Sequence, residues 1–392
     1  MTAIAQPSMS RNIWPTFRAA APVVILFVII AVVAPAVLSD FRLNLLAKFL
    51  CYAILAIGID LAWGYTGMLS LGHGVWFGLG GYSLAMYMKI IAARDLGDPL
   101  PDFMTWSGRT ALPWFWQPFT HLSLAIPAIV IVPGVLAFLL GMLVFRSRVK
   151  GAYFSIITQA LALSLTIFII GNQDSTGGMN GLTSFSTLFG KPLVKPDTLL
   201  LLYYMTVGAL AITFLFATWI TRSPLGRLMI AIRDDEDRVR FAGYNVTLIK
   251  SIVFAISAMM AGVAGALFAP QVGIISPANM DIVPSIEFVL LVAVGGRATL
   301  LGPVVGALVV GYARSFLSES FPGTWQFLYG ALFVSAVVLF PAGVVGTARK
   351  ASIARLRERL ARPGTSKPSE PDTPGTTSTI EVEARSVASG HQ

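Results

Sequence analysis

The chain has 392 residues, of which 55% are hydrophobic and only 12% are charged. Soluble globular proteins carry about 25% charged residues, so this composition excludes an ordinary soluble domain. The net charge is +9. The basic residues flank apolar stretches and form no patch with interleaved aromatic residues, so they indicate membrane orientation and not a nucleic-acid partner. Cys51 is the one cysteine, which excludes an intrachain disulfide framework.

Uncharged stretches of about 20 residues recur along the chain, and each is long enough as a helix to cross a hydrocarbon layer of roughly 30 Å. Strict alternation of polar and apolar residues is missing, so helices are expected and a β-barrel is not. The sequence therefore predicts an all-α membrane protein, surrounded by the lipid bilayer, with about ten transmembrane helices. In chain order the expected spans are 20–39, 45–63, 68–88, 122–145, 152–170, 199–220, 252–271, 285–294, 300–316 and 327–345.

The first apolar stretch allows two interpretations. Ala34-Pro35-Ala36 fits the cleavage site of a secretory signal, whereas the long polar leader and the length of the stretch favour a retained helix. We expect a cytoplasmic leader over residues 1–19 and a permease domain over residues 20–346. Residues 347–392 are expected to form a cytoplasmic tail, basic at first and disordered from Arg362 onward, where apolar residues are scarce.

Basic residues gather in every second loop, which predicts the orientation. Three basic stretches, 146–150, 222–250 and 349–362, fall on one side if ten helices begin and end in the cytoplasm, while loop 171–198 holds few basic residues. We therefore expect a multi-pass protein of the bacterial inner membrane with both termini cytoplasmic.

Two regions are expected to be broken or re-entrant helices. Stretch 285–294 is about half a bilayer long before Gly295-Gly296-Arg297, and backbone freed there needs protein or water as a partner. Seven glycines lie between Gly64 and Gly81. Glycine at this density either lets helices approach closely, which we favour, or allows the chain to unwind beside a pathway.

Motifs for ATP hydrolysis and for other catalysis are missing. The sequence contains no G-x-x-x-x-G-K-[ST] phosphate loop, no H-E-x-x-H and no G-x-S-x-G. We expect a chain that is not an enzyme, that has no ATPase site of its own, and that needs no metal or other cofactor.

Five ionisable residues within the expected spans are candidates for function, because a charge at the membrane centre costs at least ~2.5 kcal/mol. They are Lys48, Asp60, His73, Glu287 and Arg297. Lys48 is close enough to its helix end to extend its ammonium to the membrane surface, which we favour over a functional role. Asp60 and Glu287 either cap unwound segments or line a polar pathway. His73 is either a proton relay or, as we favour, a hydrogen-bonded packing residue. A chain of several buried carboxylates is missing, which argues against an ion-driven carrier.

The polar segment 221–247 has the most informative pattern. A turn at Ser223-Pro224 precedes a short helix, a charge cluster follows at 233–238, and Gly243 breaks the segment. A solvated loop has no need for the apolar residues that this helix carries, namely Leu228, Ile230, Ala231 and Ile232. Exposed apolar residues here would suit docking into a groove of a partner protein.

Four runs make the sequence resemble a known family. GYTGMLSLGHGVWFGLGGY, GGMNGLT, RSPLGRLMIAIRDDEDRVRFAGY and VGGRATLLGPVVGA are similar to the branched-chain amino acid and urea permeases of ABC importers, the LivM-like family. Within that family, CYAILAIGIDLAWGYTG, ALPWFWQPF and FRSRVKGAYFSIITQAL most resemble the urea-type, UrtC-like permease.

The resemblance implies a BtuC-like, type II importer fold in which this subunit pairs with a second, related permease. Two cytoplasmic ATP-binding subunits and a periplasmic solute-binding protein would complete the complex. The resemblance also implies two sets of site residues. ATPase coupling would use Ser223, Pro224, Gly226, Arg227, Arg233, Asp234, Asp235 and Gly243, and the translocation pathway would use Asp60, Tyr65, Thr66, Ser70, His73, Gln159 and Glu287.

The number of ionisable residues in the spans bears on the solute. Urea is neutral, whereas an amino acid brings two charges that must be paired or kept hydrated during passage, so few ionisable residues favour urea. We therefore predict ATP-driven urea transport. The alternatives are a permease for branched-chain or hydrophobic amino acids and, after it, a stand-alone channel or an ion-coupled carrier.

Overall fold

The computed structural model describes residues 14–149, 151–185, 187–339 and 343–347. Eight of the described helices are long and apolar enough to cross a membrane. Two shorter apolar helices stand at the first and last predicted spans. The expectation of an all-α membrane protein is confirmed. Residues 1–13 of the predicted leader and the predicted tail from residue 348 lie outside the described residues.

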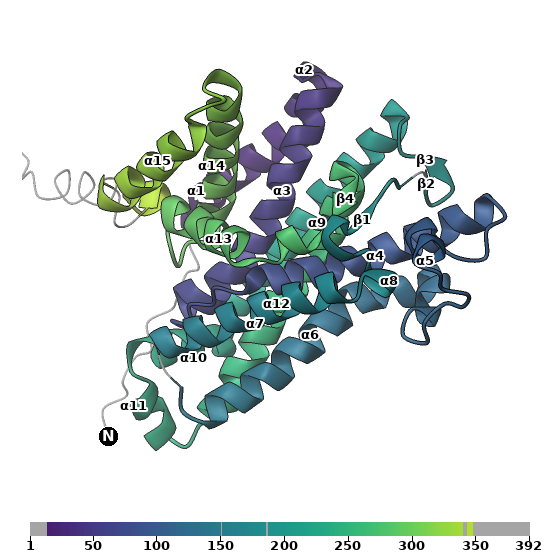
Figure 1. Ribbon diagram of the computed structural model, residues 1–392. Helices are drawn as coiled ribbons and strands as arrows, with labels where there is room; N and C mark the ends of the chain where they lie inside the picture. The colour runs from purple at the N-terminus through teal and green to yellow at the C-terminus, as the bar shows by residue number, and fades with distance from the viewer. Residues whose placement is uncertain (1–13, 150, 186, 340–342, 348–392) are drawn as a thin grey trace, which may run out of the picture. The chain divides into compact units, whose positions relative to one another are not determined.

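The long helices occur in the predicted order (Figure 1). Their bounds are α1 Trp14–Val28, continued through a π-helical turn and α2 Ala34–Val37; α3 Asp40–Asp60, continued by the π-helical turn η2 Leu61–Tyr65; α4 His73–Asp95; α6 Leu122–Arg146; α7 Ala152–Gly171; α9 Pro196–Arg222; α12 Val246–Val272; α13 Ile282–Gly295; α14 Leu301–Ser320; and α15 Trp325–Leu339.

Short elements fill the connections between the long helices. They are the helices α5 Asp102–Trp106, α8 Gln173–Thr176, α10 Pro224–Asp234 and α11 Glu236–Phe241, the 3-10 turns 117–120, 178–180 and 277–279, and the strands β1 Leu182–Thr183, β2 Thr187–Leu188, β3 Lys191–Pro192 and β4 Ile274–Ile275. β1 pairs antiparallel with β4, which ties the loop after α7 to the end of α12, and β2 pairs with β3.

The third predicted span begins later than expected. The prediction places its start at Met68, but α4 begins at His73, and residues 66–72 are not helical. Side chains of α7 supply part of the hydrogen bonding that this backbone needs. Ser155 donates to the carbonyl oxygen of Leu69 at 2.6 Å, and the amide of Leu71 donates to Thr158 at 3.0 Å. The backbone of the non-helical strip 66–72 thus forms hydrogen bonds with side chains of α7, as non-helical backbone within a membrane needs protein or water partners.

Helix α12 is the centre of the packing and lies against α3, α4 and α6 (Figure 1). Glycine allows its close approach to α4. A Cβ on Gly80 would collide with the backbone of Gly262, so the two helices meet through glycine on both sides. The interpretation of the glycine-rich region as close packing is confirmed for its helical half. The other half, before His73, is the non-helical strip.

Burial separates inner helices from outer ones. The membrane-spanning parts of α3, α4 and α12 are mostly buried by the rest of the chain, whereas only 33–39% of those of α6, α7 and α9 is buried. The outer helices expose large apolar side chains such as Leu143, Ile167 and Leu215. Exposed apolar residues on helices of this length suit contact with lipid or with another membrane subunit.

Candidate functional site

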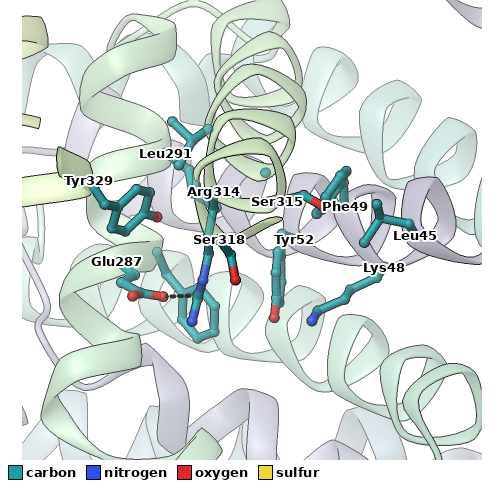
Figure 2. A pocket seen from close by; sticks show the side chains of 13 residues that line it. Leu45, Lys48, Phe49, Tyr52, Glu287, Leu291, Arg314, Ser315, Ser318 and Tyr329 are labelled. Carbon is teal, nitrogen blue, oxygen red and sulfur yellow. Dashed lines mark hydrogen bonds and ion pairs between the residues drawn. The ribbon is translucent and has the colours of Figure 1, made fainter. Parts of the chain in front are cut away.

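A cavity with charged and apolar lining lies between α3 and the three consecutive helices α13, α14 and α15 (Figure 2). Its volume is about 180 Å³. Figure 2 shows charged and hydroxyl-bearing side chains from α3, α13, α14 and α15 directed toward one space. The lining residues are Leu45, Lys48, Phe49, Tyr52, Glu287, Phe288, Leu291, Val310, Gly311, Arg314, Ser315, Ser318 and Tyr329.

An ion pair forms one wall of the cavity. Arg314 on α14 donates to Glu287 on α13 at 2.6 Å, with the two side chains 42% and 22% exposed. The guanidinium also lies over the rings of Trp325 and Tyr329, 5.6 Å and 5.8 Å from their centroids. Contacts on several sides hold this arginine in one position, because its planar group can stack on rings while it binds a carboxylate.

Lys48 faces the same cavity from α3. Its nearest recorded aromatic contact is the ring of Phe268, with Nζ 5.8 Å from the centroid. Among the described residues, no carboxylate lies within ion-pair distance of Lys48. The cavity therefore contains two cationic side chains and the single carboxylate of Glu287. Its lining has an excess of one positive charge.

A second cluster of polar contacts lies around Asp60, twelve residues beyond Lys48 and thus about 18 Å along the same helix. The amide of Ala298 donates to Oδ1 of Asp60 at 2.7 Å. The neighbouring Arg297 places its guanidinium 4.8 Å from the centre of the Trp63 ring. Asp60 therefore accepts a hydrogen bond from the turn that follows α13. This supports the interpretation of Asp60 as a cap of an unwound segment.

Arg233 on α10 reaches the same cluster. Its Nη1 donates to the carbonyl oxygen of Gly64 at 2.8 Å, while the other guanidinium nitrogens lie 3.3 Å from Asp234. Gly64 has no room for a side chain, since a Cβ there would collide with the carboxylate of Asp60. Three segments, α10, η2 and the turn after α13, are thus joined through adjacent hydrogen bonds.

The other predicted pathway residues do not line the cavity of Figure 2. His73 is fully buried, and its Nε2 lies 2.7 Å from the hydroxyl of Ser257, which in turn donates to the carbonyl oxygen of Gly58 at 2.6 Å. This geometry favours the packing interpretation of His73. Thr66 donates to a backbone carbonyl of its own segment, and Ser70 accepts from the amide of Gly72. Tyr65 and Gln159 are half-buried.

The residues predicted for coupling form two short helices and the turns around them. The hydroxyl of Ser223 donates to the carbonyl oxygen of Ile220 at 2.7 Å, and Pro224 is the first residue of α10. Gly226 packs directly on the backbone of α9, where a Cβ would not fit. Arg227 is exposed. Together these residues fix how α10 leaves the end of α9.

A capping carboxylate, Asp235, precedes α11, and a glycine, Gly243, follows its end. Asp235 accepts from the amide of Arg238 at 3.0 Å, and their side chains form an exposed ion pair at 3.5 Å. Gly243 has φ +90°, a left-handed conformation that suits glycine after a helix end. Phe241, the last residue of α11, is 92% exposed.

Most of the apolar residues of α10 that were predicted to be exposed for a partner instead pack within the chain. Ile232 is buried in a small cluster with Val239 and Val246, and Leu228 and Ala231 pack against that cluster. They hold α10 and α11 onto the start of α12, because burying apolar surface within the chain is favourable. Of the four apolar residues predicted to be exposed, only Ile230 is exposed, at 36%. Phe241 and Tyr244 are the large exposed aromatic residues of this segment.

Arg314, Tyr52 and Tyr329 line the cavity and were not predicted from the sequence. Arg314 falls inside the predicted span 300–316 and was identifiable as an intramembrane charge by the same criterion as Glu287. The two tyrosines carry no sequence signal, because aromatic residues are common in membrane helices. In the parts of the chain that the structure describes, no cluster of three histidine, cysteine or acidic residues could hold a metal ion.

Residues 41–337 match the family described as the branched-chain amino acid transport system permease component. The chain belongs to this permease family. It is 26% identical to the high-affinity branched-chain amino acid transport system permease protein LivM of Salmonella typhimurium, covering 82% of this chain and 74% of the relative. It is 24% identical to the high-affinity branched-chain amino acid transport system permease protein BraD of Pseudomonas aeruginosa, over 75% of this chain and 91% of the relative.

The ribose import permease protein RbsC of Haemophilus influenzae is 23% identical over 81% of this chain and 90% of the relative. No solved structure matches the chain significantly. The expected likeness to a BtuC-like importer therefore stays a prediction, whereas the resemblance to the LivM-like permeases is confirmed.

Proposed function

We propose that the chain is a permease subunit of an ATP-driven importer for branched-chain amino acids in the bacterial inner membrane. The observation that carries the proposal is the family match over residues 41–337, which includes the eight helices that are long and apolar enough to span a membrane. LivM and BraD are named as branched-chain amino acid permeases, and both are similar to most of this chain.

The predicted preference for urea finds no support among these relatives, and the amino-acid alternative does. The argument for urea depended on a pathway with few charges. That premise missed Arg314, which lies with Lys48 and Glu287 in one cavity. A cavity that already contains charged groups of both signs is better suited to a charged solute than to a neutral one.

The subunits that complete the transporter are part of the proposal. A second, related permease would form the pathway with this chain, a periplasmic protein would deliver the solute, and two cytoplasmic subunits would hydrolyse ATP. The segment from Ser223 to Gly243 is proposed to contact those ATPases. Its exposed charges and the exposed ring of Phe241 give it a surface suited to a protein partner.

Uptake by the reconstituted complex tests the proposal. The chain is co-purified with its permease partner, its two ATP-binding subunits and its binding protein, and placed in liposomes that contain ATP. Labelled leucine, isoleucine and valine should accumulate, and urea should not. Accumulation of urea alone would restore the first prediction. Equal leucine flux without ATP, or without the ATP-binding subunits, would indicate a channel and contradict the proposal.

A further inference from the structure

The lining of the cavity in Figure 2 has two cationic side chains, Lys48 and Arg314, and one carboxylate, Glu287. Among the described residues no carboxylate lies within ion-pair distance of the Lys48 ammonium, and Glu287 attracts it only from farther away. Ionisable residues within membrane spans are rare and commonly mark solute pathways. A ligand with a negative group at Lys48 would remove the imbalance.

Glu287 can also accept further hydrogen bonds. Arg314 binds its Oε2, and among the described residues no donor is recorded for its Oε1. An ionised carboxylate offers about four acceptor sites, so the ion pair leaves room for another donor such as an ammonium group. Lys48 and Glu287 lie on α3 and α13, which pack against each other. The cavity thus offers a cation on one helix and an acceptor on the other.

Apolar side chains form the rest of the lining. Phe49, Phe288, Leu291 and Val310 are each at most 4% exposed, and Leu45 is half-buried. Ligand sites in proteins combine an apolar lining with a few polar groups that fix orientation, as this cavity does. Its volume of about 180 Å³ is small and exceeds several-fold the ~30 Å³ that one water occupies in the liquid.

We propose that this cavity binds the zwitterion of an aliphatic amino acid. The ligand carboxylate lies at the Lys48 ammonium, the ligand ammonium donates to Glu287, and the aliphatic side chain lies against Phe49, Phe288 and Leu291. The hydroxyl of Tyr52 is positioned to contribute a further hydrogen bond from α3. This inference rests on the proposed function and adds to it a site within one permease subunit, separate from the solute site of any binding protein.

Arg314 acts here as a positioning residue. Its ion pair with Glu287 and its two ring contacts hold α13, α14 and α15 together around the cavity. Removing Arg314 would leave Glu287 without its partner and disturb the lining as a whole. Lys48, which forms no ion pair among the described residues, is the sharper target for a test.

The test measures leucine binding to the complete transporter in lipid nanodiscs, without the binding protein and without ATP. Wild-type transporter should bind leucine measurably, and Lys48→Gln should weaken the affinity at least 10-fold. Lys48→Arg, which keeps the charge, should retain most of the affinity. Lys195→Gln changes an exposed lysine near β3 and should have no effect. Each variant should purify with the same ratio of subunits as the wild type, which shows that the transporter still assembles.

Two analogues identify the groups that are recognised. Leucinamide lacks the carboxylate and 4-methylpentanoate lacks the ammonium, so both should bind at least 10-fold more weakly than leucine to the wild type. Lys48→Gln should abolish the preference for leucine over leucinamide. Equal affinity of wild type and Lys48→Gln for leucine would overturn the proposal, as would equal binding of leucine and leucinamide.

Failure of this inference is distinguishable from failure of the proposed function. If Lys48→Gln binds leucine and transports it as the wild type does, the pocket assignment is wrong and the transport function stands. If the wild-type complex accumulates no branched-chain amino acid, the proposed function itself is wrong, whatever binds in the cavity.

Discussion

Arg233 on the exposed helix α10 donates a hydrogen bond of 2.8 Å to the carbonyl oxygen of Gly64, at the end of a buried membrane helix. Gly64 belongs to η2, whose first residues follow Asp60, and Asp60 accepts from the amide of Ala298. A displacement of α10 would therefore act directly on η2 and on the turn that joins α13 to α14. Helix α13 carries Glu287 of the cavity, so this route connects the two regions.

Replacing Arg233 tests this connection. Arg233→Ala removes a charged hydrogen bond of a kind that contributes about 1.5–3 kcal/mol, and α10 then moves without displacing η2. The amount of leucine imported per ATP hydrolysed should fall several-fold in proteoliposomes, while ATP hydrolysis continues. Arg233→Lys keeps the charge but has one nitrogen in place of the three that contact Gly64 and Asp234, so an intermediate loss is expected. An unchanged ratio in Arg233→Ala would show that this contact does not transmit motion.

Asp60 should contribute to stability through its bond to Ala298. Asp60→Ala leaves a half-buried backbone amide without a partner, at a cost of about 1–3 kcal/mol. Since 1 kcal/mol shifts the Tm of a protein of 150–250 residues by roughly 2–4 °C, the apparent Tm of the purified permease in detergent should fall by a few degrees. Asp60→Asn keeps an acceptor oxygen and should lose less. Asp98→Ala, at an exposed position, is the control, and an equal effect there would contradict the prediction.

Hydropathy predicted the helices of this fold because it reports on the solvent around a helix, and glycine spacing predicted where two helices approach closely. Each of the ten expected spans overlaps an observed helix, but α13 has 14 residues where the sequence indicated ten, and with the 3-10 turn before it forms a 19-residue stretch long enough to span. Residues 68–72 were predicted as helix because Met68, Leu69 and Leu71 are apolar. Hydropathy cannot reveal that Ser155 and Thr158, over 80 residues away in the chain, supply partners for its backbone.

The cavity could not be predicted from the sequence for a related reason. Lys48, Glu287 and Arg314 come from three helices, and the spacing along each helix gives no information on which side faces which neighbour. Glu287 was identified singly because intramembrane charge is rare. Its partner is 27 residues away in the chain, on the next helix, and only the packing of α13 against α14 brings the two side chains together.

Thiol labelling can determine the orientation, which stays a prediction. Cys51 is fully buried, so a membrane-impermeant maleimide should not react with it and the native cysteine can stay in place. Phe241→Cys places a thiol on α11, and Val194→Cys places one after β3, both at sites that are about 90% exposed. In intact cells, a membrane-impermeant maleimide should label Val194→Cys and should label Phe241→Cys only after lysis. The opposite pattern would place α10 and α11 in the periplasm and would exclude contact with cytoplasmic ATPases.

The crossing of α4 and α12 should tolerate no side chain at Gly80. A Cβ there would meet the backbone of Gly262, and overpacking of a well-filled contact costs about 1–3 kcal/mol even for a small group. Gly80→Ala should lower the apparent Tm in detergent, and Gly80→Leu should prevent accumulation of folded protein in the membrane. Gly208→Ala is the matched control, since Gly208 is also within a long helix but has nothing within 4 Å of a Cβ. Alanine forms helices more readily than glycine, so this control should be neutral or slightly stabilising. If Gly80→Ala and Gly208→Ala gave the same Tm, close approach of the two helices would not be the reason for glycine at position 80.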